Sequence, residues 1–194
     1  GRASPQRARA QTTLPEAASD TLHPTLAVHA LLAAFPHALL FDEAGLSTSD
    51  LRQWMRCDAG HYFTNGSGGI GWGLAAAVGA AVGRPERQVM AIIGDGSSLY
   101  ASEALWSAAH HGTSMLLVVL SNRRYATLNA AAGKLAGGAL DAFTLEPPAF
   151  DFAGLAALHG WTFVRARTQA ALDQTLQRWQ GRVPDNTLLE LVLD

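Results

Sequence analysis

The sequence predicts a doubly wound α/β fold, in which a mainly parallel sheet of about six strands carries helices on both faces. Strand-like and helix-like segments alternate along most of the chain, the pattern of parallel sheets built from right-handed crossovers. Two strand segments, QVMAII at 88–93 and SMLLVVL at 114–120, are apolar without alternation. Such runs are typical of strands that are covered on both faces.

The individual elements follow from hydrophobic periodicity and from residues that begin or end helices. The first helix, at 24–35, has apolar residues at helical spacing, starts with Pro24 and stops before Pro36. The helix at 72–82 consists almost entirely of small residues, which allow close backbone packing. The other predicted segments are a strand at 38–41, helices at 50–57, 101–111 and 152–159, a strand at 161–164, a helix at 169–180 capped by Thr168, and a strand at 187–193.

Composition and charge are those of an ordinary globular protein, with 48% hydrophobic and 15% charged residues in a chain of 194. The net charge is −2 and basic residues do not cluster, which argues against nucleic-acid and anionic-membrane partners. No apolar run reaches the ~20 residues of a membrane span, and the single Cys57 cannot form an internal disulfide. We therefore expect a cytoplasmic protein without nucleic-acid or membrane partners.

The N-terminal segment is rich in Arg, Ala, Ser and Pro and lacks the apolar core of a secretory signal. We expect residues 1–21 to be a linker or disordered tail and residues 22–194 to form one domain.

Polar residues follow the two buried apolar strands where each strand ends. GDGS at 94–97 comes after the first of these strands, and SN at 121–122 comes after the second. One helix joins the two strands, so both carboxyl ends meet at the edge of the sheet where ligands bind. Carboxylate and amide oxygens suit Mg²⁺, which often bridges a protein to phosphates, and glycines let a backbone approach a ligand. Each motif alone is more often a plain turn, but together they predict a metal-bound diphosphate.

A second glycine-rich stretch, NGSGGIG at 65–71, satisfies the G-x-G-x-x-G fingerprint of dinucleotide-binding folds. That interpretation needs an apolar strand directly before the glycines, yet GHYFTN at 60–65 is too short and polar for a buried parallel strand. It also leaves the glycines around Asp95 unexplained. We therefore favour a turn that serves a different phosphate cofactor.

The run GDGSSLYASEALWSAAHHGTSMLLVVLSNRRY resembles the cofactor motif of thiamine diphosphate (ThDP) dependent enzymes, a GDG followed one helix and one strand later by NN. Ser121 replaces the first Asn of that motif, and Asn122 matches the second. The resemblance implies that Asp95, Asn122 and the backbone carbonyl of Arg124 bind Mg²⁺. A backbone ligand tolerates the unusual Arg124 side chain, so this departure does not by itself remove the site.

Similarity extends over residues 22–194 and, through GGIGWGLAAAVGAAVGRPERQVMAIIGDGS and ALWSAAHHG, is greatest to benzoylformate decarboxylases, with acetolactate synthases next. It implies the C-terminal, diphosphate-binding (PP) domain of a three-domain enzyme that acts on a small 2-oxo acid. In this family the glutamate needed for catalysis comes from the N-terminal (PYR) domain of a partner subunit in a homodimer or homotetramer. The resemblance thus implies no catalytic residue in this chain and no activity of the chain alone.

The resemblance also assigns the glycine turn. The Gly68 carbonyl would accept a hydrogen bond from the pyrimidine amino group, and Ile70 would wedge between the two rings of the cofactor. The diphosphate would meet the loop at 43–47 and the segment at 94–97. The complete set of implied cofactor residues is Gly45, Leu46, Gly68, Gly69, Ile70, Gly94, Asp95, Gly96, Ser97, Asn122, Tyr125 and Ala126.

Relatives place substrate-facing residues on a mobile segment that corresponds to residues 125–134. Asn129-Ala130-Ala131 stands where benzoylformate decarboxylases have aromatic residues, which predicts a wider or differently shaped pocket. Two alternatives stay open: an acetolactate synthase-like carboligase, and a non-catalytic module that binds ThDP or serves in assembly. The presence or absence of a PYR domain before residue 1 in the parent protein distinguishes an enzyme from a module.

Overall fold

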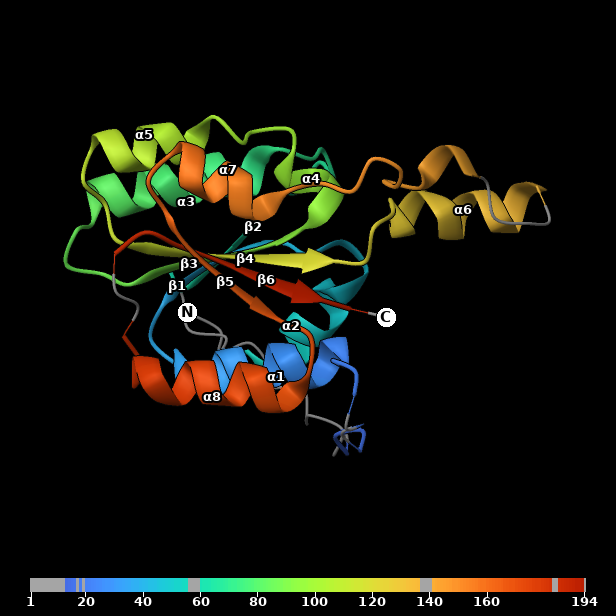
Figure 1. The fold of residues 1–194 in the computed structure, drawn as a ribbon, viewed down its shortest axis with the longest axis horizontal. Coiled ribbons are helices and arrows are strands. Elements are labelled where there is room, and N and C mark those ends of the chain that lie inside the picture. The colour runs from blue at the N-terminus through green and yellow to red at the C-terminus, as the bar shows by residue number, and fades with distance from the viewer. Residues whose placement is uncertain are drawn as a thin grey trace, which may run out of the picture.

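The computed structural model describes residues 13–16, 18, 20–55, 60–136, 141–182 and 185–193; most of the predicted tail, and Cys57, lie outside them. In this part of the chain, six strands form one parallel sheet in the order β2-β1-β3-β4-β6-β5 (Figure 1). The strands are β1 (Leu39–Glu43), β2 (Tyr62–Thr64), β3 (Val89–Gly94), β4 (Met115–Ser121), β5 (Thr162–Ala166) and β6 (Thr187–Val192).

Helices cover both faces of this sheet (Figure 1), which confirms the doubly wound α/β fold. One layer contains α3 (Trp72–Gly83), α5 (Ala104–His110) and α7 (Phe152–Leu158), and the other contains α1 (Pro24–Ala34), α2 (Thr48–Trp54) and α8 (Gln169–Trp179). The short α4 (Asp95–Ser98) continues β3, and α6 (Ala126–Ala136) extends to the side of the layers. Among the described residues, no helix has the length and apolar character needed to cross a membrane.

Each helix layer packs its own apolar cluster against the sheet, and β4 shows this most clearly. All its residues are buried. Its even-numbered residues from Leu116 to Leu120 join the cluster of α1, α2 and α8, whereas its odd-numbered residues from Met115 to Val119 join that of α3, α5 and α7. Burial of each such side chain contributes about 1.5–3 kcal/mol. Two-sided burial explains why this strand is an unbroken apolar run in the sequence.

The arrangement of the strands creates a crevice between β1 and β3. After β1 the chain turns to the face covered by α2, whereas after β3 it turns to the opposite face, toward α5. The register aligns Glu43 with Ile93, and Gly94 with Leu120, so the carboxyl ends of β1, β3 and β4 lie side by side. Doubly wound sheets bind their ligands where the chain reverses in this way.

The strand β2 and the helix α6 are among the elements missing from the prediction. The edge strand β2 has three partly buried or exposed residues and pairs with β1 alone. It leads into the glycine turn, and its shortness and exposure confirm that the residues before the glycines do not form the buried strand of a dinucleotide site. The helix α6 forms within the segment expected to be mobile, because its alanines have high helix propensity.

Several boundaries also differ from the predicted ones. The helix expected at 101–111 begins only at Ala104, because the single turn α4 and a short bend come first. The helix expected at 50–57 begins earlier, at Thr48, and α2 ends at Trp54. Thr168 caps α8 as predicted, and its hydroxyl accepts a hydrogen bond from the Ala171 amide at 3.2 Å.

Substitutions at the two ends of α7 test the packing of the core. Phe152 is 2% exposed within the cluster of α3, α5 and α7, whereas Leu158 is 76% exposed. We expect Phe152→Ala to lower the free energy of unfolding by about 3–5 kcal/mol because it leaves a cavity. Leu158→Ala should change it by less than about 0.5 kcal/mol. Denaturant unfolding of both variants measures these values, and equal losses would contradict the buried position of Phe152.

Candidate functional site

A cleft of about 580 Å³ lies at the carboxyl ends of β1, β2, β3 and β4 and extends to the first turn of α6. It is therefore located at the crevice that the strand order creates. Every residue that the sequence predicts for cofactor or metal binding lines it. These residues are Gly45 and Leu46 after β1; Gly68, Gly69 and Ile70 after β2; Gly94, Asp95, Gly96 and Ser97 at the end of β3; and Asn122, Arg124, Tyr125 and Ala126 after β4.

Asp95 is the first residue of α4 and is 5% exposed. Its Oδ1 accepts a hydrogen bond from the Gly96 amide at 2.8 Å, and its Oδ2 accepts one from the Arg123 amide at 2.6 Å. Burial raises the pKa of the Asp95 carboxyl, while the backbone amides of Gly96, Arg123 and Asn122 act in the opposite direction. The carboxylate thus ties the end of β3 to the loop that follows β4.

The loop after β4 is a tight turn. Arg123 has a φ of 60°, in the left-handed region, and the Asn122 Oδ1 accepts a hydrogen bond from the Arg124 amide at 3.2 Å. The Arg124 carbonyl accepts one from the Ala126 amide at 2.9 Å, which leaves one lone pair for another donor or a metal. The turn therefore brings Asn122 and Arg124 to the cleft that Asp95 also lines.

The two glycines that flank Asp95 differ in what surrounds them. A Cβ on Gly94 would find only the Ser97 Oγ, at 4.0 Å, so a ligand can approach the backbone there. A Cβ on Gly96 would collide with the ring of Tyr125. The Tyr125 ring therefore occupies the space that a side chain at residue 96 would need, a constraint on Gly96 that the sequence pattern does not include.

The glycine turn between β2 and α3 is held by hydrogen bonds from two sides. The Asn65 side chain donates to the Gly69 carbonyl at 2.8 Å and accepts from the Ser67 amide at 2.8 Å. Glu43, the last residue of β1, accepts from the amide of Gly71 at 2.6 Å and also from that of Gly73. This placement differs from the expected one, in which Glu43 belongs to the diphosphate loop.

A polar network in the wall of the cleft, formed around Asp42, is not among the residues that the sequence analysis predicts. The buried Asp42 accepts hydrogen bonds from the Ala44 amide at 3.0 Å, from the Thr48 hydroxyl at 2.9 Å and from the Tyr62 hydroxyl. The Arg52 Nε donates to the Tyr62 hydroxyl at 3.1 Å. Burial and the hydrogen bond to Asp42 raise the pKa of Tyr62. The network fixes the loop after β1, and the sequence signal for it is an Asp that ends a buried apolar run.

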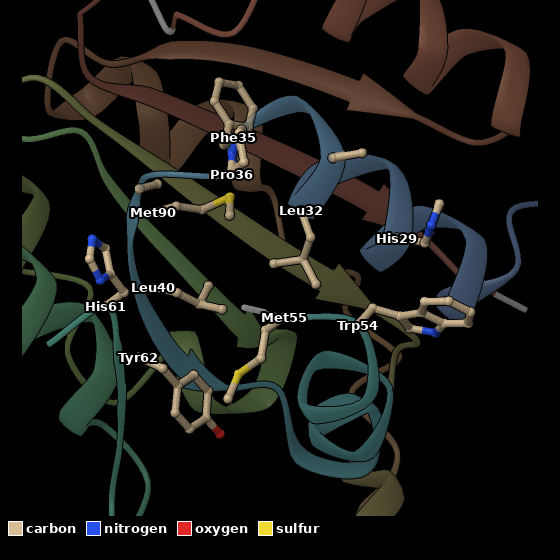
Figure 2. A pocket seen from close by; sticks show the side chains of 12 residues that line it. His29, Leu32, Phe35, Pro36, Leu40, Trp54, Met55, His61, Tyr62 and Met90 are labelled. Carbon is tan, nitrogen blue, oxygen red and sulfur yellow. The ribbon is translucent and has the colours of Figure 1, made fainter. Parts of the chain in front are cut away.

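A second, smaller pocket of about 140 Å³ lies near the edge strand β2 and is lined by α1, the end of α2 and β1 (Figure 2). His61 lines this pocket together with Trp54 and Met90, and it is not among the residues that line the cleft. Apolar side chains such as Leu32 and Leu40 make up much of its wall. Nothing in this pocket resembles the glycine and oxygen-donor arrangement of the cleft.

The comparison with known families agrees with this geometry. Residues 43–190 match the family model described as "Thiamine pyrophosphate enzyme, C-terminal TPP binding domain", thiamine pyrophosphate being another name for ThDP. The chain therefore belongs to this family of ThDP-binding domains.

Individual proteins similar to this chain include decarboxylases and a putative acetolactate synthase subunit. The chain is 36% identical over 159 residues to a benzoylformate decarboxylase of Pseudomonas aeruginosa, a match that covers 80% of the chain and 30% of the relative. It is 35% identical over 101 residues to a putative acetolactate synthase large subunit of Mycobacterium tuberculosis, covering 49% of the chain and 20% of the relative. A structure of a ThDP-dependent 4-hydroxybenzoylformate decarboxylase from Rhodococcus jostii RHA1 superimposes with a TM-score of 0.86 at 28% identity, covering the whole chain and 37% of that protein. The chain thus spans about a third of these two decarboxylases.

The residues of the cleft fit a metal-bound diphosphate with attached rings. Asp95 is a buried carboxylate, so a cation beside it would offset the cost of its burial. Among the described residues, no hydrogen bond reaches the Gly68 carbonyl, which remains available to a donor on the cofactor. The described residues contain no cluster of three or more His, Cys, Asp and Glu side chains suited to a metal. A metal in the cleft would instead use a mixed set of carboxylate, amide and backbone oxygens, which Mg²⁺ accepts.

A substitution that removes the Tyr62 hydroxyl tests the polar network around Asp42. We expect Tyr62→Phe to lower the free energy of unfolding by about 1–2 kcal/mol, because the buried Asp42 loses a donor. The folded-state pKa of Tyr62 is raised above its ordinary value of 10.0, so this contribution is complete below that pH and is lost as pH rises through the folded-state pKa. Thermal unfolding at neutral and alkaline pH measures it. Tyr100→Phe, at an exposed ring, is the control, and an equal loss there would contradict the assignment.

Proposed function

We propose that the complete protein containing this chain is a cytoplasmic, ThDP- and Mg²⁺-dependent 2-oxo acid decarboxylase of the benzoylformate decarboxylase type. This chain would be the domain that binds the cofactor diphosphate through the metal. The observation that carries the proposal is the meeting of Asp95, Asn122 and the glycine turn in one cleft. The family membership supports the cofactor, and the descriptions of the Pseudomonas and Rhodococcus relatives support the reaction class.

In this proposal three oxygen donors hold Mg²⁺: the Asp95 carboxylate, the Asn122 side-chain oxygen and the Arg124 carbonyl. The hydrogen bonds from the Gly96 and Arg123 amides orient the carboxylate before the metal arrives. A preformed site avoids part of the cost of ordering its ligands on binding. Water and diphosphate oxygens would complete the coordination of the ion.

The diphosphate itself would be bound by two segments on either side of the crevice. Gly45 and Leu46 lie in the 3₁₀ turn η1 (Gly45–Ser47), and both are exposed and line the cleft. Gly94 and Ser97 lie at the end of β3 and in α4. Backbone amides at the first turn of α4 and the Ser97 hydroxyl are suitable donors to an anion.

The rings of the cofactor would lie against the turn after β2. The Gly68 carbonyl would accept from the pyrimidine amino group, Gly69 would allow close approach, and Ile70 would separate the two rings. Ile70 is 43% exposed at the cleft, so its side chain is available for that contact. When bound, the cofactor supplies the electron sink that allows a 2-oxo acid to lose CO₂.

Completion of the site would require the PYR domain of a partner subunit in a homodimer or homotetramer. Leu46, Ile70 and Leu128 line the cleft although they are 55%, 43% and 50% exposed. Three exposed aliphatic side chains around one cleft suit a surface that another domain and a cofactor cover. The partner's domain would also bring the glutamate that acts on the pyrimidine ring.

The substrate would be a small 2-oxo acid that meets the cleft near the start of α6. Tyr125, Thr127 and Leu128 line the cleft on that side, next to the small Ala126. An acetolactate synthase-like carboligase is the second candidate, and the 35% identity to the putative acetolactate synthase subunit of Mycobacterium tuberculosis favours it. Measuring the products formed from different 2-oxo acids identifies the substrate and distinguishes decarboxylation from carboligation.

Calorimetry of the complete protein with ThDP and Mg²⁺ tests the metal assignment. We expect Asp95→Ala and Asn122→Ala each to weaken ThDP binding by about 100-fold or more, and to reduce its dependence on Mg²⁺, because each removes a metal ligand. Asp173→Ala, which removes an exposed carboxylate on α8, is the matched control and should bind as the parent does. Unchanged, metal-dependent affinity in both cleft variants would show that the metal binds elsewhere.

Turnover of a panel of 2-oxo acids tests the reaction. We expect the complete protein to release CO₂ from at least one of benzoylformate, pyruvate and a branched-chain 2-oxo acid, and the chain alone to release none because it lacks the partner glutamate. Acetolactate formation from pyruvate would favour the carboligase. ThDP binding by the complete protein without turnover of any substrate would favour the non-catalytic module, and turnover by the chain alone would contradict the proposed division between domains.

A further inference from the structure

We propose that Glu43 is a positioning residue that holds the glycine turn in the shape needed to present the Gly68 carbonyl and Ile70 to the cofactor rings. The inference rests on the proposed function, because it assigns a role toward ThDP. Glu43 is not among the proposed cofactor-binding residues: it lies at the end of β1 and would act through the backbone of α3. Neither the GDG motif nor the fingerprint at 65–71 includes it.

The contacts of Glu43 are directed at the start of α3. Its Oε1 accepts from the Gly71 amide at 2.6 Å, and its Oε2 accepts from the Gly73 amide. The first amides of a helix have no partner within the helix, and α3 has no side-chain cap from its own N-cap residue, Gly71. Glu43 therefore caps α3 from a distant strand, with a negative charge at the positive end of the helix.

Steric contacts hold the same backbone on two sides. A Cβ on Gly73 would lie 3.0 Å from both the Cβ and the Oε2 of Glu43. A Cβ on Gly71 would lie 2.9 Å from the Cβ of Tyr100, and Gly71 has a φ of 90°, which favours glycine. The start of α3 is thus fixed between the end of β1 and Tyr100. Any side chain at either position would force one of these contacts apart.

This anchoring determines where Ile70 lies. Ile70 is bonded directly to Gly71 and is 43% exposed, so packing covers its side chain only in part. Its position follows from the backbone on either side: Asn65 holds the turn at Gly69, and Glu43 holds it at Gly71. Both Glu43 oxygens face backbone amides, which indicates a positioning role and not proton transfer to a substrate.

The test uses the complete protein with Glu43→Gln and Glu43→Asp. Gln keeps the size but presents an NH₂ group to one of the two amides, whereas Asp keeps the charge on a shorter side chain. Glu86→Gln is the control, because Glu86 is an exposed acid beyond the other end of α3. Two probes separate the ring side of the site from its diphosphate side: ThDP with Mg²⁺, and Mg²⁺ with inorganic pyrophosphate, which has no rings. Hydrogen exchange of the amides at 68–73 without cofactor reports the turn directly.

We expect Glu43→Gln to accelerate exchange of the Gly71 and Gly73 amides and to weaken ThDP binding by about tenfold or more, as loss of a charge-assisted hydrogen bond implies. Pyrophosphate binding should stay within about twofold of the parent, since its donors lie elsewhere in the cleft. Glu43→Asp should recover part of the loss, and Glu86→Gln should match the parent.

Equal weakening of both probes would overturn the inference, because it would show a general structural effect of the substitution. Unchanged exchange and unchanged ThDP affinity in Glu43→Gln would overturn it as well. Failure of the parent protein to bind ThDP would instead overturn the proposed function. In that case the exchange result would still show whether Glu43 fixes the turn.

Discussion

The parallel pairing of β3 with both β1 and β4 is the constraint on which the rest of the site depends. It places three carboxyl ends side by side, and the chain leaves β1 and β3 toward opposite faces, so a crevice opens between them. Burial on both faces prevents slippage of the central strands, since a shift of one residue would exchange the two apolar clusters. The loops at the edge can therefore be short and rich in glycine while their positions stay fixed by the sheet beneath them.

Three carboxylates at this edge of the sheet stabilise the loops in the same way. Asp42, Glu43 and Asp95 lie at or next to a strand end, and each accepts at least one hydrogen bond from a backbone amide of the loop or helix that it fixes. Asp42 holds the loop after β1, Glu43 holds the start of α3, and Asp95 holds the loop after β4. Charge-assisted bonds of this kind are about twice as strong as neutral ones. These bonds preorganise the loops, as the proposed binding of a metal-bound cofactor would require.

The sequence could predict the fold and the residues around the cleft because their signals are local. Unbroken apolar runs indicate buried parallel strands, and GDG with a later Asn marks two adjacent strand ends. The edge strand β2 escaped prediction because its three residues pair with β1 without an apolar run of their own. The role of Gly96 and the partners of Glu43 and Asp42 depend on residues distant in sequence, such as Tyr125 and Tyr62. No local pattern reports such contacts.

The most direct test of the central claim is a crystal structure of the complete protein with ThDP and Mn²⁺, in which anomalous scattering locates the metal. We expect one metal peak in the crevice between β1 and β3, bound by the Asp95 carboxylate, the Asn122 side-chain oxygen, the Arg124 carbonyl and the diphosphate. The cofactor rings would lie against Ile70. A metal or diphosphate located away from Asp95 and Asn122, for example in the pocket beside His61, would contradict the account.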